Sequence, residues 1–103
     1  MINHEQKTVI VIPVYNGKKM LGRSLESCLK QTKATETWVI NNVSTDGTPE
    51  VGKEYADKYE NIKFIQNKTN LGRVGNWNRG LELFEQSQYL YIKFLFAGDE
   101  LFP

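Results

Sequence analysis

The sequence lacks several features that mark common functional classes. Its 103 residues include one cysteine, Cys28, and one histidine, His4, so neither an internal disulfide nor a histidine metal cluster is available. A lone cysteine favours a reducing compartment, and we expect a cytoplasmic protein. No apolar run approaches the roughly 20 residues of a membrane span, and the polar start lacks a signal-peptide pattern.

Charge and motif content exclude further classes. Thirteen basic and twelve acidic residues give a formal net charge of +1, and the basic residues are scattered among acids. A nucleic-acid partner, which usually requires a basic stripe, is therefore not expected. The chain has no Walker A motif and no Gly-x-Ser-x-Gly elbow, and Gly72, Gly75 and Gly80 do not form the dinucleotide-binding fingerprint.

Strand and helix patterns alternate along the chain. Apolar runs predict strands at residues 8–14, 37–41, 61–66 and 89–96, the first of them buried on both faces. Helical spacing predicts helices from residue 18 to about 31, from residue 48, and around an inner face made of Val74, Trp77, Leu81 and Phe84. This order predicts a three-layer α/β/α fold with a mainly parallel sheet and right-handed crossovers. Cys28 lies on the apolar face of the first helix, so we interpret it as a core residue.

Polar clusters follow the first, second and fourth predicted strands, at the sheet edge where such folds bind ligands. Pro13 ends the first strand, and Tyr15 is placed either to stack on a base or to pack at the surface. The amide of Asn41 suits the edge of a uracil-like base, although a polar turn is the alternative. We interpret Asp46 as a helix cap.

Two further clusters carry possible ligand chemistry. Glycines precede the third helix, whose N-terminus favours anions, and Arg73 or Arg79 can contact a diphosphate or a base carbonyl there. The alternative is an ordinary solvated arginine. After the fourth strand, Asp99 and Glu100 form an acidic turn of the kind that binds Mg²⁺ or Mn²⁺, or one that is simply solvated.

In this order, the clusters resemble glycosyltransferase family 2, a group of inverting enzymes with the GT-A fold. The matching stretches are VIPVYNG (11–17), VINNVSTDGT (39–48), NKTNLGRVGNWNRGLE (67–82) and YIKFLFAGDELFP (91–103). The resemblance covers nearly the whole chain. It covers only the first half of a typical family domain. It implies that residues 1–103 are one partial domain, the donor-nucleotide-binding half, cut after the fourth strand.

The resemblance also implies a nucleotide-diphosphate sugar donor, most often a uridine one, and a divalent metal, Mn²⁺ or Mg²⁺. It implies that Asp99 is the metal ligand, since Phe96 and Gly98 stand where family members often carry aspartates. Asn41 stands where the family usually has a base-binding aspartate. The nucleotide contacts that it implies are Pro13, Tyr15, Asn16, Asn41, Asn70 and Arg79.

The mechanism implied is direct displacement, in which an acceptor hydroxyl attacks the anomeric carbon and charge develops on the departing diphosphate. No catalytic residue is expected within the chain, because the family's base lies further along, so the isolated chain is expected to be inactive. A glycan or lipid-linked acceptor would bind the missing half, in polysaccharide biosynthesis, with the parent protein cytoplasmic or peripheral at the membrane.

Two alternatives remain open. The first is a non-catalytic nucleotide-binding or interaction domain with a degenerate metal site, favoured by Asn41 and Gly98. The second is an unrelated receiver-like domain, which would carry acidic residues after the first strand, where this chain has Tyr15 and Asn16.

Overall fold

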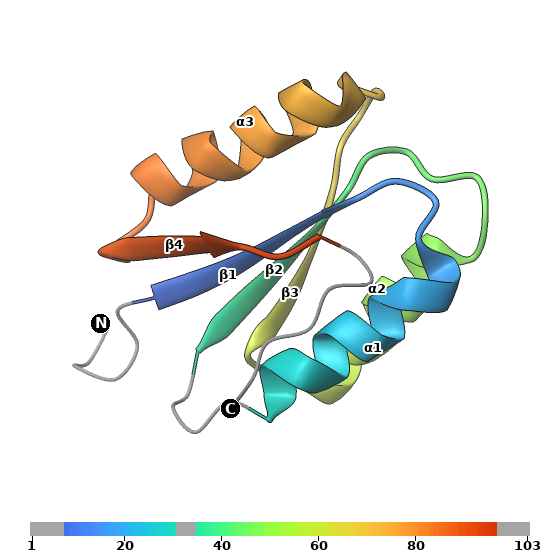
Figure 1. Cartoon of the computed structure of the whole chain (residues 1–103), viewed down its shortest axis with the longest axis horizontal. Coiled ribbons are helices and arrows are strands. Elements are labelled where there is room, and N and C mark those ends of the chain that lie inside the picture. Colours follow the sequence, from blue (N-terminus) through green and yellow to red (C-terminus); the bar gives the residue numbers. More distant parts are fainter. Residues whose placement is uncertain (1–7, 31–34, 97–103) are drawn as a thin grey trace.

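A computed structural model describes residues 8–30 and 35–96 of the chain (Figure 1). Strands and helices alternate in this part, in the order that the apolar pattern predicts. The strands are β1 (Thr8–Val14), β2 (Glu36–Asn41), β3 (Ile62–Gln66) and β4 (Tyr91–Phe94). The helices are α1 (Lys18–Leu29), α2 (Thr48–Lys58) and α3 (Gly72–Glu85).

The four strands form one parallel sheet in the order β3-β2-β1-β4. β1 lies between β2 and β4, and the β-branched run of its sequence is buried almost throughout, as predicted for a strand covered on both faces. Val14 pairs with Asn41, and Asn41 pairs with Gln66, so the carboxyl ends of β1, β2 and β3 lie level. The loops that leave these ends therefore meet at one rim of the sheet.

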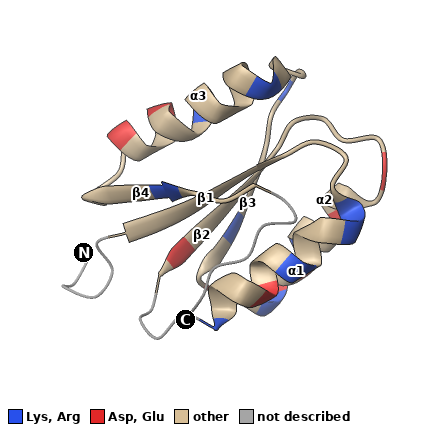
Figure 2. Ribbon diagram, viewed as in Figure 1, with Lys and Arg blue, Asp and Glu red and all other residues tan. Residues whose placement is uncertain are grey.

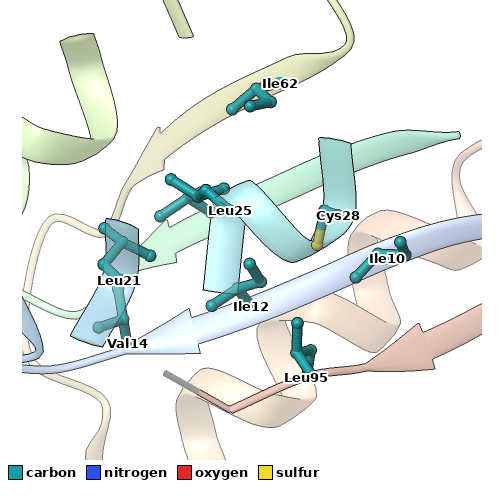
Figure 3. Packing of buried hydrophobic residues seen from close by; sticks show 9 residues of the cluster. Ile10, Ile12, Val14, Leu21, Leu25, Cys28, Ile62 and Leu95 are labelled. Atoms are coloured by element: carbon teal, nitrogen blue, oxygen red, sulfur yellow. The ribbon is translucent and has the colours of Figure 1, made fainter. Parts of the chain in front are cut away.

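Helices α1 and α2 cover one face of the sheet, and α3 covers the other (Figure 1). Alternate residues of β1 point to the two faces: Ile10, Ile12 and Val14 pack toward α1, whereas Val9 and Val11 pack toward α3. Figure 3 shows Leu21 and Leu25 of α1 against the first of these groups. Cys28 belongs to the same cluster and is 3% exposed, which confirms it as a core residue.

The predicted inner face of α3 is wrong for three of its four residues, because Val74, Trp77 and Leu81 are exposed. The buried residues of α3 are Asn76 and Gly80. A Cβ atom at Gly80 would lie 2.9 Å from Cγ1 of Val11, so the helix approaches β1 closely at this glycine. This close approach turns the larger apolar side chains of α3 to the flank of the helix.

The flank of α3 lies over β4, which is the last strand on one side of the sheet formed by the described residues. The Trp77 ring meets Phe94 and Phe96 edge-on, at centroid distances of 5.4 and 5.7 Å. β4 is shorter than the predicted strand at 89–96 at both ends. At its start, Tyr89 packs against β2, where its hydroxyl donates to Glu36 and its ring meets that of Trp38.

Charged residues are spread over all three helices and over β2, β3 and β4, whereas β1 carries none (Figure 2). The helices of the described residues are each too short, or too polar, to cross a membrane.

Candidate functional site

The β1–α1 and β2–α2 loops are bound to each other at the rim of the sheet. Asn16 adopts a left-handed backbone conformation, with φ of 51°. Its backbone N–H donates to Ser44 Oγ at 2.9 Å, and its side-chain Oδ1 accepts from the N–H of Thr45 at 2.8 Å. Asn16 therefore joins the two loops, and the nucleotide contact that the resemblance implied for it stays a prediction.

Asp46 strengthens the same junction by serving the starts of two helices. Its carboxylate accepts the N–H of Thr48, at the start of α2, at 2.9 Å and the N–H of Lys18, at the start of α1, at 3.2 Å. Desolvation raises the pKa of Asp46, but the hydrogen bonds from Thr48 and Lys18 outweigh it and hold the pKa below its ordinary value. The predicted capping role is thus extended to a second helix.

Beyond this junction, the amides of three buried asparagines connect β2, β3 and α3. Asn67 Nδ2 donates to Asn42 Oδ1 at 3.1 Å and to Asn76 Oδ1 at 2.7 Å. Asn76 Nδ2 donates in turn to the backbone carbonyl of Ile40 at 3.1 Å. These contacts fix the N-terminal part of α3 at the carboxyl ends of β2 and β3.

A pocket of about 410 Å³ opens at this corner, between the end of β1 and the start of α3. Its volume lies within the range of about 300–1,000 Å³ that is usual for small-molecule sites. Tyr15 contributes an aromatic side chain that is 52% exposed, and Phe96 contributes a second one. The lining residues are Pro13, Val14, Tyr15, Asn42, Asn70, Gly72, Arg73, Asn76 and Phe96.

The described lining of the pocket carries a positive charge. Among the described residues that line it, Arg73 carries the only formal charge. Arg73 lies in the first turn of α3, which contains no acidic residue, and the acids of this helix lie toward its other end (Figure 2). Acidic residues are usually preferred at a helix N-terminus, where the helix dipole is positive. Here the residue is basic, so the dipole of α3 and the side chain of Arg73 both contribute positive potential. The arrangement suits an anion such as a phosphate.

The structure brings together three of the six predicted nucleotide contacts: Pro13, Tyr15 and Asn70 line the pocket. The other three lie outside the lining. Asn16 joins two loops, and Arg79 lies 3.7 Å from Glu82 further along α3. Asn41 is 1% exposed and is engaged with Gln66 Oε1 at 2.7 Å and Ser44 Oγ at 2.6 Å.

The pocket contains two residues that the sequence analysis passed over, Asn42 and Asn76. The alternation of side chains between the two faces of β2 is the sequence signal that indicates Asn42. Trp38 and Ile40 pack in the cluster on the α3 side, and Asn42 is next on that face, whereas Asn41 continues the opposite one. Arg73 was considered beside Arg79, and the start of α3 at Gly72 places Arg73 nearer the rim.

The structure does not test the predicted metal ligand. Asp99 lies outside the described residues, and residues 8–30 and 35–96 contain no group of three metal-ligating side chains. The described lining of the pocket offers amide oxygens and no carboxylate, and Phe96 presents an aromatic ring there. These residues by themselves do not fit a divalent cation, which prefers carboxylate oxygens.

Comparison with known families and proteins gives consistent results. Residues 9–95 match the model of glycosyl transferase family 2. The chain is 34% identical, over its full length, to the uncharacterized glycosyltransferase YibD of Escherichia coli (strain K12), of which it covers 29%. It is 36% identical over 72 residues to a poly(ribitol-phosphate) beta-glucosyltransferase of Bacillus spizizenii, covering 67% of this chain and 11% of that protein.

Solved structures show the same similarity. TarS 1-349 of S. aureus, in complex with UDP-GlcNAc, superposes with a TM-score of 0.78 at 29% identity over 92% of this chain and 27% of its own. Its complex with UDP gives a TM-score of 0.76 at 30% identity. The mannosyltransferase PcManGT of Pyrobaculum calidifontis shares the fold, with a TM-score of 0.67 at 21% identity, over 75% of this chain and 24% of that one. These neighbours have the GT-A fold, and the chain spans less than a third of their length.

Proposed function

The chain belongs to glycosyl transferase family 2, and we propose that its pocket binds the nucleotide part of a nucleotide-diphosphate sugar. The observation that carries the proposal is the position of the pocket. It lies beyond the carboxyl ends of parallel strands, where open α/β sheets bind ligands, and beside the positive N-terminus of α3.

Each part of the pocket suits one part of the ligand. The exposed ring of Tyr15 offers a flat surface for a base, and Arg73 with the first turn of α3 suits the diphosphate. Uridine is the proposed base, because the TarS complexes hold UDP and UDP-GlcNAc. Asn70 on the rim can exchange hydrogen bonds with the base or ribose.

In a complete family domain, this half would present the donor for inverting transfer to an acceptor hydroxyl on a glycan or lipid-linked substrate. A bound Mn²⁺ or Mg²⁺ would neutralise charge on the diphosphate, with Asp99 as its proposed ligand. The residues described here bind and orient the donor. We propose that the 103-residue chain does not transfer sugar by itself, because the general base lies elsewhere in the parent protein.

A non-catalytic nucleotide-binding domain is the second candidate. The observation in its favour is the absence of a carboxylate from the described lining of the pocket, where Phe96 presents a ring. Such a domain would bind nucleotide through Arg73 and the rim without a metal.

Titration of the isotope-labelled chain with UDP, followed by two-dimensional NMR, tests the proposal. We expect the amides of Tyr15, Asn70 and Arg73 to shift together. Arg73→Ala should weaken binding by about five- to tenfold, the loss expected for one partly exposed charged contact. Arg23→Ala, with the same change of charge on α1, is the matched control.

Two outcomes decide between the candidates. Binding that strengthens with Mn²⁺, and loses this gain in Asp99→Ala, supports the metal-dependent enzyme. Binding indifferent to both favours the non-catalytic domain. If millimolar UDP leaves the amides around the pocket unshifted, neither candidate holds.

A further inference from the structure

The two sides of the pocket differ in chemistry, and β1 lies between them. On the side of β2 and α3, the lining contains the amides of Asn42, Asn70 and Asn76, which offer hydrogen-bond donors and acceptors. On the side of β4, it contains the side chains of Pro13 and Phe96, which offer neither. A ligand that fills the pocket therefore needs a hydrogen-bonding part on one side and an apolar face on the other.

Pro13 ends the pairing between β1 and β4 and thereby frees the chain at Phe96. The ladder between these strands runs as far as a hydrogen bond of 2.9 Å from the N–H of Leu95 to the carbonyl of Val11. In a parallel ladder, residue 13 would donate the next hydrogen bond, to the carbonyl of Leu95. Proline has no N–H, so this bond cannot form. Phe96 thus follows the last paired residue and stands at the pocket.

The ring of Phe96 is held on the α3 face of the sheet. The preceding residue, Leu95, is buried in the apolar cluster on the opposite face. Trp77 of α3 meets the Phe96 ring edge-on, at a centroid distance of 5.7 Å and an interplanar angle of 89°. Trp77 also meets the ring of Phe94, which lies within β4, at 5.4 Å. These two contacts support Phe96 from behind, because Trp77 lies outside the described lining of the pocket.

The supported ring of Phe96 still has surface to offer a ligand. Its side of the pocket is open, since the residue is 40% exposed. A phenyl ring is a flat apolar surface, and covering it with another apolar surface is favourable. The carbon-bound hydrogens of a sugar ring form such a surface, whereas a phosphate group does not.

We propose that Phe96, supported by Trp77, is a stacking site for the ribose of the nucleotide. The base has donors and acceptors along its edge, so it belongs with the amides and with the ring of Tyr15, and the diphosphate belongs with Arg73. The ribose connects the base to the diphosphate, and its carbon-bound hydrogens cover the Phe96 ring. This inference rests on the proposed function, because it assigns a further part of the same ligand.

Nuclear Overhauser effects between the wild-type chain and bound UDP-GlcNAc test the assignment directly. Selective labelling of the phenylalanine rings, assigned through their backbone amides, identifies Phe96. We expect effects between the Phe96 ring and the carbon-bound ribose protons, and between the Tyr15 ring and uracil H5 and H6. If Phe96 shows no effect to the ribose, or effects only to the uracil or GlcNAc protons, the proposal is overturned.

A series of three ligands measures the contribution of the ring. Phe96→Leu keeps an apolar side chain but removes the flat surface, so it should weaken UDP and UDP-GlcNAc by the same factor, about two- to tenfold. Pyrophosphate, which has no ribose, should bind as to the wild type. Phe96→Tyr keeps the ring and should restore the affinity for both nucleotides. Tyr91→Leu changes a ring of the same strand that is 62% exposed and lies outside the described lining, so it is the matched control.

The support from Trp77 is tested in the same series. Trp77→Leu leaves the Phe96 ring present but less firmly held, so we expect a smaller loss for both nucleotides, about twofold, and none for pyrophosphate. A loss in Trp77→Leu that equals or exceeds the loss in Phe96→Leu would mean that Trp77 contacts the ligand itself, and its supporting role would be wrong.

The outcomes separate this inference from the proposed function. If Phe96→Leu weakens UDP-GlcNAc alone, the transferred sugar covers the ring; if it also weakens pyrophosphate, the pocket as a whole is disturbed. Either result overturns the ribose site. Unchanged UDP affinity in Phe96→Leu overturns it as well and leaves the proposed function standing. If the wild-type chain does not bind UDP, both fail together.

Discussion

The two faces of the sheet are covered in different ways. On the α1/α2 face, Ile12, Leu21 and Leu25 are 0% exposed and belong to one apolar cluster (Figure 3). On the other face, α3 turns Asn76 and Gly80 toward the sheet and leaves Val74 65% exposed.

This difference separates stability from ligand binding. The α1/α2 face buries large apolar side chains, which is the main source of folding free energy. On the α3 face, part of the contact with the sheet consists of amide hydrogen bonds, which contribute less free energy but hold the pocket wall in one orientation. Substitutions on the first face should therefore change stability, and substitutions around the start of α3 should change binding.

The largest expected effect follows from truncating a leucine on each face. Leu25→Ala removes a fully buried side chain from the α1/α2 core and should lower the free energy of unfolding by about 2–5 kcal/mol. Leu81→Ala, with the same chemical change on the flank of α3 at 38% exposure, should cost less than about 1 kcal/mol. Urea unfolding followed by circular dichroism measures both. Equal losses in the two variants would show that both leucines contribute equally to the free energy of unfolding. The proposed difference between the two faces would then be wrong.

The order of elements could be predicted from the sequence, and the rotation of α3 could not. The strands and helices follow from apolar runs and their spacing, because burial of those residues is what forms the elements. The spacing rule assumes that the inward face of a helix is apolar. In α3, Gly80 faces inward because Val11 leaves no room for a larger residue, and Asn76 does so because Ile40 offers a carbonyl. Both reasons are contacts with another element, which the local sequence does not contain.

The candidate site was predictable to a similar degree. The end of the first strand placed Pro13 and Tyr15, and the family resemblance placed Asn70, at the rim where the pocket lies. The choice of Asn41 over Asn42 depended on which face of β2 the pocket uses, and that face is set by the position of α3. Composition and motifs locate the rim, and the packing of the third helix decides which side chains reach it.

A smaller effect is expected at the junction of loops above the α1/α2 face. Asp46→Asn should lower the free energy of unfolding by about 1 kcal/mol near neutral pH. The amide keeps one accepting oxygen where the carboxylate has two, so one of the two hydrogen bonds to the starts of α1 and α2 is lost. The pKa of Asp46 is lowered in the folded chain, so its contribution is complete above the ordinary value of 3.8 and disappears as pH falls through the lower folded value. Urea unfolding from about pH 7 to about pH 3 should show wild type and variant converging at the acidic end. A constant difference across this range would mean that the charge of Asp46 contributes nothing.

The smallest expected effect is at Val43, which is compared with Asn16, the other left-handed residue beside this junction. Val43 has a φ of 58°, which costs a β-branched residue about 1–2 kcal/mol, whereas asparagine tolerates the similar conformation of Asn16. Val43→Gly relieves that strain but gives the unfolded chain more freedom, so we expect a net gain in stability of about 0.5 kcal/mol. Asn16→Gly relieves little strain and loses the hydrogen bonds to Thr45, so it should cost about 1 kcal/mol. Thermal and urea unfolding of both variants measure this difference in sign. A loss of stability in Val43→Gly would mean that the half-buried valine side chain contributes more by packing than its backbone conformation costs, and the turn after Asn42 would then belong to the tightly packed part of the molecule.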